Sequence, residues 1–346
     1  MTDLDVSPAQ RSARDVLAWG RALVDPALRA AVDRLPESMR SIAGYHFGWW
    51  DEHGVPTGAD AGKAIRPVLV LLAARAVGGR PEDALPAAVA VELVHNFSLL
   101  HDDVMDGDAT RRHRPTAWAV FGVNAAVLAG DALMTLALDV LAASGHPASA
   151  RGIVLLSAAV QELLDGQSSD LGFEERDEVG VAECVRMAEG KTAALLGACC
   201  SLGALFGGGS ADQVGELGLF GERTGLAFQF VDDLLGIWGD PAATGKPVHS
   251  DLRNRKKSLP VVAALASRSQ AGRELTGLYR GRGELAGSAL EQAAELVEQA
   301  GARAWGQRRA DELLAQARTH LRASGVDPVA ARELDAVAVL MTRRDR

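Results

Sequence analysis

The sequence predicts a single large all-α domain that spans residues 1–346, and three observations lead to that prediction. Apolar residues recur at intervals of three and four along most of the chain, and sustained alternation is almost absent. Alanine and leucine dominate while aromatic residues make up 5%, which is a helical composition. The apolar content of 48% is enough for a large core, which excludes a disordered chain.

Glycine and proline clusters mark where the helices stop, at 78–81, 144–147, 207–209 and 239–247. No polar linker is long enough to separate two domains, and no repeat of about 33 to 45 residues indicates a solenoid. The helical spacing predicts helices over residues 8–33, 38–50, 63–78, 84–107, 117–143, 147–170, 179–206, 211–238, 257–268, 285–300, 302–323 and 327–342.

Charge and cysteine content exclude several classes of protein. With 36 basic and 45 acidic residues the net charge is −9, so no nucleic-acid partner is expected, and an anionic ligand would need a local basic cluster. The three cysteines contain no C-x-x-C pair, which argues against a disulfide framework or a zinc site. The N-terminus lacks an apolar leader, and the uncharged run 192–211 is rich in small residues. A cytoplasmic protein without a transmembrane segment is therefore expected.

The helix expected at 84–107 ends in a cluster of acids. Asp102 and Asp106 are four residues apart, so they project from one helix face. Like charges at this spacing are mildly destabilising, and Mg²⁺ compensates them naturally because it takes carboxylates together with phosphate oxygens. The basic run 111–114 follows at once. These residues favour a site for a hard divalent cation, although the acids alone would also fit a solvated helix end.

The helix expected at 211–238 repeats this pattern. Asp232 and Asp233 lie in a stretch that is apolar nearly all round, with Gln229 one turn before Asp233. Buried carboxylates are unfavourable unless a metal or a basic group meets them. A second basic run, 253–257, follows. The repetition of acid pair and basic run predicts two parts of one anion-binding site.

With these motifs the chain resembles the trans-isoprenyl diphosphate synthases, the polyprenyl synthetase family, and among them the geranylgeranyl diphosphate synthases. The family's first aspartate-rich motif, Asp-Asp-x-x-Asp followed by Arg-Arg, is matched by Asp102, Asp103, Asp106, Arg111 and Arg112. Its Gly-Lys-x-x-Arg-Pro motif matches 62–67, its Lys-Thr pair matches 191–192, and its second aspartate-rich motif matches 228–233. The second motif usually has a third acid where Gly236 stands, and Asp240 is a candidate substitute.

The resemblance implies a helical bundle of the isoprenoid synthase type with a central substrate cavity. It implies a Mg²⁺-dependent prenyltransferase that condenses isopentenyl diphosphate with an allylic diphosphate (dimethylallyl, geranyl or farnesyl) to a short-chain all-trans product. It also implies a homodimer.

The resemblance also assigns roles to individual residues. The implied metal ligands are Asp102, Asp106 and Asp232, supported by Asp103 and Asp233, and the implied catalytic cations are Arg111, Lys191 and Lys246. The implied substrate-binding residues are Lys63, Arg66, His95, Arg112, Thr192, Gln229 and Lys256. For His95 a satisfied core histidine is the open alternative.

The residues one turn before Asp102 predict the product length. Phe97 and Ser98 precede Asp102 by five and four residues, and five residues of helix rise about 7.5 Å. In the family, an aromatic residue at the deeper position alone resembles enzymes that form geranylgeranyl diphosphate, which predicts a C20 product. The alternatives are a farnesyl diphosphate synthase, a terpene cyclase on the same fold, and a non-catalytic subunit of a heteromeric synthase.

Overall fold

The computed structural model describes residues 11–58, 62–240, 248–281 and 283–343. Contacts divide these residues into two compact units. The first unit contains the described residues up to Leu155, with Cys199–Leu217 and Leu321–Ala338, and the second contains Leu156–Ala198, Gly218–His320 and the described residues from Val339 onward. Each unit is described by itself, and the single domain over 1–346 stays a prediction.

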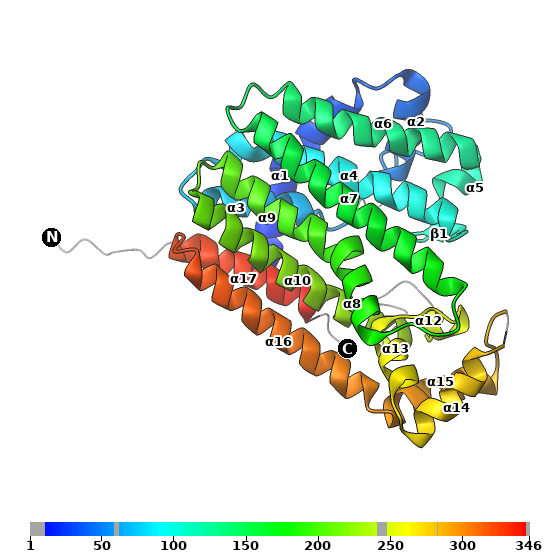
Figure 1. The fold of residues 1–346 in the computed structure, drawn as a ribbon. Coiled ribbons are helices and arrows are strands. Elements are labelled where there is room, and N and C mark those ends of the chain that lie inside the picture. Colours follow the sequence, from blue (N-terminus) through cyan, green and yellow to red (C-terminus); the bar gives the residue numbers. More distant parts are fainter. Residues whose placement is uncertain (1–10, 59–61, 241–247, 282, 344–346) are drawn as a thin grey trace. The chain divides into compact units, whose positions relative to one another are not determined.

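In the first unit the central helix is α4 (Leu85–Met105), which is buried along most of its length (Figure 1). A helix that is apolar nearly all round belongs in a core. Helices α3 (Ile65–Ala76) and α6 (Val123–Ala142) both pack against α4. The unit also contains α1 (Ala13–Val32), α2 (Glu37–His46), the short 3₁₀ helix η1 (Pro81–Ala84) and α5 (Ala117–Phe121).

A two-stranded hairpin follows α4. Strands β1 (Thr110–Arg111) and β2 (Arg114–Pro115) are antiparallel, with Arg111 opposite Arg114. Arg112 and His113 form the turn and have positive φ angles of 50° and 61°. Two-residue hairpin turns of this kind usually contain Asn and Gly. Because neither residue stands here, the sequence analysis predicted only a basic loop.

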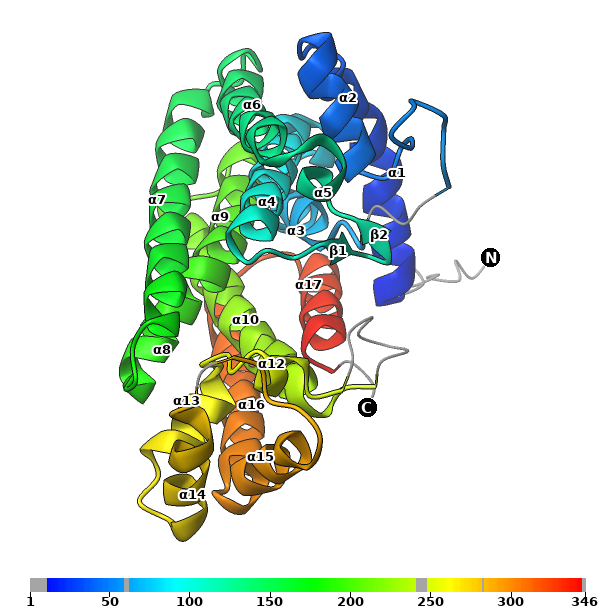
Figure 2. The ribbon, with the colours of Figure 1, turned by 90° about the vertical axis from the view of Figure 1, so that its right-hand side faces the viewer.

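The second unit contains two groups of packed apolar side chains. One surrounds Phe230 and Leu259, and the other surrounds Ile237 and Leu275. Its helices are α8 (Val181–Ala188), the π-helical turn η2 (Glu189–Ala193), α12 (Ser250–Arg253), α13 (Leu259–Ala266), α14 (Gln270–Tyr279) and α15 (Ser288–Gln299) (Figure 2).

Five helices continue from one unit into the other along the chain: α7 (Ser149–Glu174), α9 (Ala194–Phe206), α10 (Ala211–Trp238), α16 (Ala302–Ala323) and α17 (Pro328–Thr342). The expected all-α fold is confirmed, with local corrections. The helix expected at 117–143 is interrupted at Gly122, whose φ is 87°, and the helix expected at 179–206 contains the π-turn. Helix α14 was not predicted, because glycine and threonine weaken its helical signal.

Two helical stretches, Pro81–Met105 and Val123–Ala142, are long and apolar enough to cross a membrane on length and composition alone. A buried core helix passes the same test, and 67% of the most apolar window in the first stretch is buried. The uncharged run at 192–211 forms the end of η2, the helix α9 and a glycine turn, as the sequence predicts.

Candidate active site

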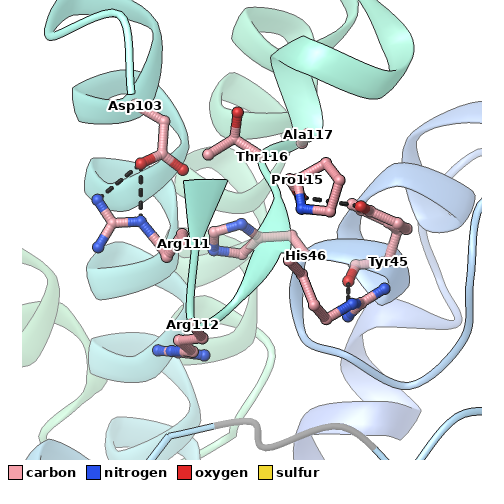
Figure 3. Close-up of a pocket in the computed structure, with 9 residues that line it drawn as sticks. Tyr45, His46, Asp103, Arg111, Arg112, Pro115, Thr116 and Ala117 are labelled. Atoms are coloured by element: carbon pink, nitrogen blue, oxygen red, sulfur yellow. Dashed lines mark hydrogen bonds and ion pairs between the residues drawn. The ribbon is translucent and has the colours of Figure 1, made fainter. Parts of the chain in front are cut away.

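A basic hollow lies in the first unit between α2, the end of α4 and the hairpin (Figure 3). Its volume is about 20 Å³. We call it the hairpin hollow, and its lining residues are Tyr45, His46, Asp103, Arg111, Arg112, Arg114, Pro115, Thr116 and Ala117. Three of these side chains are arginines and one is a carboxylate, so the lining is suited to an anion.

Asp103 fixes the hairpin to α4. The Arg111 Nε and Nη2 atoms each lie 2.7 Å from Asp103 Oδ1, and Asp103 is 1% exposed. Burial raises the pKa of Asp103, although the Arg111 guanidinium opposes that rise. Since Asp103 is held inward by Arg111, the more exposed Asp102 and Asp106 are the acids that can meet a ligand.

The hairpin turn directs Arg112 away from Asp103 (Figure 3). Its guanidinium lies against Gly62, where a Cβ atom would come within 2.9 Å of Arg112 Nη2. Gly62 has a φ of 92°, and Lys63 follows it directly. The Gly-Lys-x-x-Arg-Pro segment and the second arginine of the Arg-Arg pair are therefore close together in space, as the sequence analysis expected.

Arg66 and His95 join the same group of residues. Arg66 Nη1 lies 3.2 Å from His95 Nε2, at hydrogen-bonding distance between α3 and α4. Burial, and then the positive charges of Arg66 and Arg112, lower the pKa of His95 well below its usual value. Burial also lowers the pKa of Arg66. His95 is therefore a neutral imidazole beside two cations, and it differs from a core histidine satisfied by a carbonyl group.

A second cavity, of about 160 Å³, lies entirely within the second unit. We call it the α10 cavity. Six residues proposed from the sequence line it, from helix α10, the π-turn and the segment before α13. The complete lining is Asp170, Met187, Lys191, Thr192, Gln229, Asp232, Asp233, Lys256 and Ser258.

A chain of hydrogen bonds holds the inner acid of this cavity. Thr192 Oγ1 donates to Gln229 Oε1 at 2.6 Å, and Gln229 Nε2 donates to Asp233 Oδ1 at 2.8 Å. The backbone N–H of Leu259 donates to Asp233 Oδ2 at 2.8 Å. Burial raises the pKa of Asp233 to about 7 against the opposing charge of Lys256. Asp232, by contrast, is exposed, so each acid pair has one buried member and one that is more accessible.

The π-turn presents Lys191 and Thr192 side by side. The N–H of Ala194 bonds to the carbonyl of Glu189, five residues back, and such turns are frequent at functional sites. Lys191 Nζ lies 2.6 Å from Asp170 Oδ2 on α7. Lys256 lies among acids, and Asp251, Asp233 and Asp170 raise its pKa.

The carboxylate of Asp251 occupies the space beside Gly236. A Cβ atom at Gly236 would lie 2.4 Å from Asp251 Oδ2, and Ser250 Oγ donates to the Gly236 carbonyl at 3.3 Å. The structure therefore places Asp251 beside Gly236, and the substitution by Asp240 that the sequence analysis suggested stays a prediction. Asp251 was missed because it is distant in sequence from the second aspartate-rich motif.

The product-length residues lie on α4. Phe97 is buried and contacts His101 edge to face, with ring centroids 4.8 Å apart. The Ser98 hydroxyl donates to the His95 carbonyl at 2.8 Å. Lys246 lies outside the described residues. In the part of the chain that the structure describes, no three His, Cys, Asp or Glu side chains gather into a preformed metal cage.

Sequence reasoning missed several residues at the two sites, chiefly His46, Tyr45, Asp170 and Ser258. Tyr45 and His46 lie in α2, which carries no acid pair or basic run that would have marked it. Asp170 is a single acid in a long helix. Only the folded contacts with Lys191 and the hairpin give these residues a place in the site.

Comparison with known proteins agrees with the geometry. The polyprenyl synthetase family matches residues 56–297. A (2E,6E)-farnesyl diphosphate synthase of Mycobacterium bovis is 48% identical over 318 residues, covering 91% of this chain and 86% of that protein. A geranylgeranyl diphosphate synthase of Mycobacterium tuberculosis is 46% identical over 331 residues, covering 95% and 93%.

Solved structures give the same result. The crystal structure of a polyprenyl synthetase from Streptomyces coelicolor A3(2) has a TM-score of 0.90 and 46% identity to this chain, covering 94% of it and 98% of the other. Two acid pairs, each with a buried and an accessible member, stand in a fold of this kind. The chain belongs to the polyprenyl synthetase family, and it is a prenyltransferase of the short-chain trans-prenyl diphosphate synthase type.

Proposed function

We propose that this enzyme is a geranylgeranyl diphosphate synthase, which condenses isopentenyl diphosphate with allylic diphosphates to a C20 product. The observation that supports the condensation most directly is that the two aspartates of each acid pair differ in their surroundings. In each pair one aspartate is held by protein donors, while its neighbour is more accessible beside several cations. The proposal assigns diphosphate binding to the accessible aspartate of each pair.

The donor set fits a hard divalent cation. Asp102, Asp106 and Asp232 offer carboxylate oxygens, and Mg²⁺ binds one or two carboxylates together with phosphate oxygens and water. We propose these three residues as its ligands. When bound, Mg²⁺ neutralises charge on the leaving diphosphate.

The remaining groups of the chain have distinct proposed roles at the allylic substrate. The allylic C–O bond breaks and its electron pair leaves on the diphosphate, which Arg111, Lys191, Lys246 and Lys256 stabilise. The Thr192 hydroxyl and Gln229 amide present neutral dipoles to the allylic cation. The alkene then forms the new C–C bond, and the proton lost from the product goes to the released diphosphate, because the α10 cavity offers no strong neutral base among its described residues.

Isopentenyl diphosphate has a separate proposed site in the first unit. Lys63, Arg66, His95 and Arg112 would bind its diphosphate, and the Gly62–Arg112 and Arg66–His95 contacts support that grouping. Arginine forks bind phosphate oxygens in pairs. The carboxylates Asp102 and Asp106 would face the other substrate.

Product length rests on α4. Phe97 is bulky, while Ser98 is small and bonded to its own helix, which supports a tunnel closed at the deeper position only. A farnesyl (C15) product is the second candidate, because the 48% identical relative is named for that activity. We further propose that the enzyme works in the cytoplasm as a homodimer.

The decisive experiment is turnover of the purified protein with isopentenyl diphosphate and each of the C5, C10 and C15 primers, with and without Mg²⁺, followed by product mass analysis. A dominant C20 product that requires Mg²⁺ is expected. A C15 product would establish the second candidate. Hydrocarbon formed from geranylgeranyl diphosphate alone would indicate a cyclase, and no turnover by the protein alone would indicate a non-catalytic subunit.

A further inference from the structure

We propose that His46 is a further substrate-binding residue, whose Nε2 contacts a terminal oxygen of the isopentenyl diphosphate. The inference rests on the proposed function, since it assigns a ligand to the site formed by Arg66, His95 and Arg112. His46 belongs to none of the motifs through which the sequence resembles the family.

The first observation is an unused polar atom. His46 Nε2 is buried, and no described residue meets it in hydrogen-bonding geometry. The Asn96 side chain lies close enough to oppose the lowering of the His46 pKa, and its own Oδ1 is likewise buried without a partner. A buried polar atom without a partner is unfavourable, and folded proteins rarely leave one. A histidine placed only for packing would be expected to bond a carbonyl group, as His101 does with the Val127 carbonyl at 3.0 Å.

The second observation is the surroundings of this atom. His46 lines the hairpin hollow together with Arg111, Arg112 and Arg114 (Figure 3). Arg111 is paired with Asp103, which is the only carboxylate among the described residues of that lining. A metal ion would be repelled by this cationic lining, whereas a phosphate oxygen would be attracted to it.

The size of the hollow limits what reaches His46. Its volume of about 20 Å³ has room for a single oxygen atom, not for a whole diphosphate. The bulk of the ligand would therefore lie on the Gly62 side of Arg112, with one terminal oxygen extending to Nε2. Burial and the charges of Arg112, Arg111 and Arg114 lower the pKa of His46 to about 3, so the free protein holds it neutral and able to donate one N–H.

Several contacts fix the end of α2, which carries His46, to the hairpin. The neighbouring Tyr45 donates its hydroxyl to the Pro115 carbonyl at 2.8 Å, and the Arg114 guanidinium lies 4.5 Å from the Tyr45 ring centroid. Arg114 also donates to the carbonyls of Tyr45 and Trp50, both at 3.2 Å. The end of α2 is thus fixed to the hairpin, which presets the position of His46 for binding.

Steady-state kinetics of the full chain test this assignment. His46→Leu removes the donor, and His46→Gln brings an amide to the Nε2 position. His46→Asn keeps a polar group that is too short to reach it. We expect His46→Leu and His46→Asn to raise the KM for isopentenyl diphosphate by about tenfold or more, as for a lost bond to a charged group. The kcat and the allylic KM should change by less than about threefold, and His46→Gln should recover most of the loss.

Two further measurements separate the possible failures. Calorimetric binding of isopentenyl diphosphate to the protein without an allylic substrate should show the same loss of affinity, whether or not the protein turns over. His53→Leu, at an exposed histidine outside the hollow, should behave as wild type. Equal KM increases for both substrates, or equal values for Asn and Gln, would overturn the inference. If the His46 variants lost affinity for isopentenyl diphosphate as expected but the wild-type protein showed no turnover, the proposed function would be overturned instead.

Discussion

At the scale of single residues, two histidines are kept neutral by burial and by arginines. His46 has a pKa near 3 in the folded protein, and His95 is also lowered, whereas a histidine in the unfolded chain titrates near 6.5. Between these values the unfolded chain binds more protons than the folded protein. Stability therefore falls as the pH falls from about 6.5 toward 3.

Replacing His46 with Gln should flatten this dependence. Between its folded and unfolded pKa values, each such histidine adds about 1.4 kcal/mol per pH unit to the slope of the unfolding free energy against pH. The variant should lose this contribution between about pH 4 and 6. Urea unfolding at several pH values measures it. His53→Gln, whose side chain is 78% exposed, is the matched control. Parallel curves for the His46 variant and the wild type would show that His46 is already protonated when folded.

Replacing Gly236 with a larger residue is expected to lower kcat. In Gly236→Ala the new Cβ would lie 2.4 Å from the Asp251 carboxylate, which must rotate away. Because a displacement of about 1 Å can lower catalysis by two orders of magnitude, we expect kcat to fall at least about tenfold while the fold survives. Gly215→Ala on the same helix meets open space and should leave kcat unchanged. An unchanged kcat in both variants would remove Asp251 from the site.

Phe97 sets the expected product length. Phe97→Ala should lengthen the tunnel and shift the products beyond C20, because the ring is buried on α4 one turn and more before Asp102. Mass analysis of the products measures the shift. Phe121→Ala, on the separate helix α5, is the control. The same length distribution in wild type and Phe97→Ala would place the determinant of chain length elsewhere.

At the scale of elements, the hairpin depends on one ion pair. Asp103→Ala leaves Arg111 partly buried without its carboxylate, and breaking such a pair is expected to destabilise the protein by about 3 kcal/mol or more. The exposed pair between Arg34 and Asp139 provides the control, since Asp139→Ala should change stability by about 1 kcal/mol or less. Urea unfolding compares the two variants, and equal losses would mean that the hairpin does not depend on Asp103.

The sequence predicts the long helices well and the short irregular elements poorly. Helix α4 was recognised because its apolar residues recur over many turns before the acids. The hairpin was not, because its turn residues Arg112 and His113 lack the Asn-Gly or Asp-Gly pair that usually marks a two-residue hairpin turn. The five described non-glycine residues with positive φ are Ala64, Arg112, His113, His249 and Arg255. Arg112 is a predicted site residue, and Ala64, His113 and Arg255 each adjoin one, in regions where backbone strain is common.

The site shows the same limit of sequence reasoning. The family's motifs identified Lys191, Gln229 and Asp233, because they recur at fixed spacings. Asp251, Asp170 and His46 have roles that depend on contacts across the fold, which spacing along the chain does not encode. Tertiary contacts also revealed that Asp251 lies beside Gly236.

At the scale of the whole molecule, the proposed function assigns diphosphate binding to Asp102 in one unit and to Asp232 in the other. Mg²⁺ with inorganic pyrophosphate should therefore stabilise the protein, by about 2.7 kcal/mol at a hundredfold excess over Kd. We expect a rise in Tm of several degrees with both together, and little with either alone.

Variants at the two accessible aspartates test whether each of them contributes to the binding of pyrophosphate. Asp102→Asn and Asp232→Asn should each abolish most of the rise in Tm, whereas Asp212→Asn, at the exposed start of α10, should retain it. Scanning calorimetry or dye-based melting measures the difference. If the Asp232 variant kept the full rise while the Asp102 variant lost it, the two acid pairs would not bind the same pyrophosphate.

The extra residue of the π-turn in the second unit changes the direction in which side chains project from the helix. Five residues complete this turn where about four suffice in an α-helix, so the chain holds one surplus residue between α8 and α9. The extra residue rotates the side-chain positions of α9 about the helix axis relative to those of α8, without breaking the helix. A side chain in the turn can thereby point toward a reactive centre while α8 and α9 keep their own packing contacts.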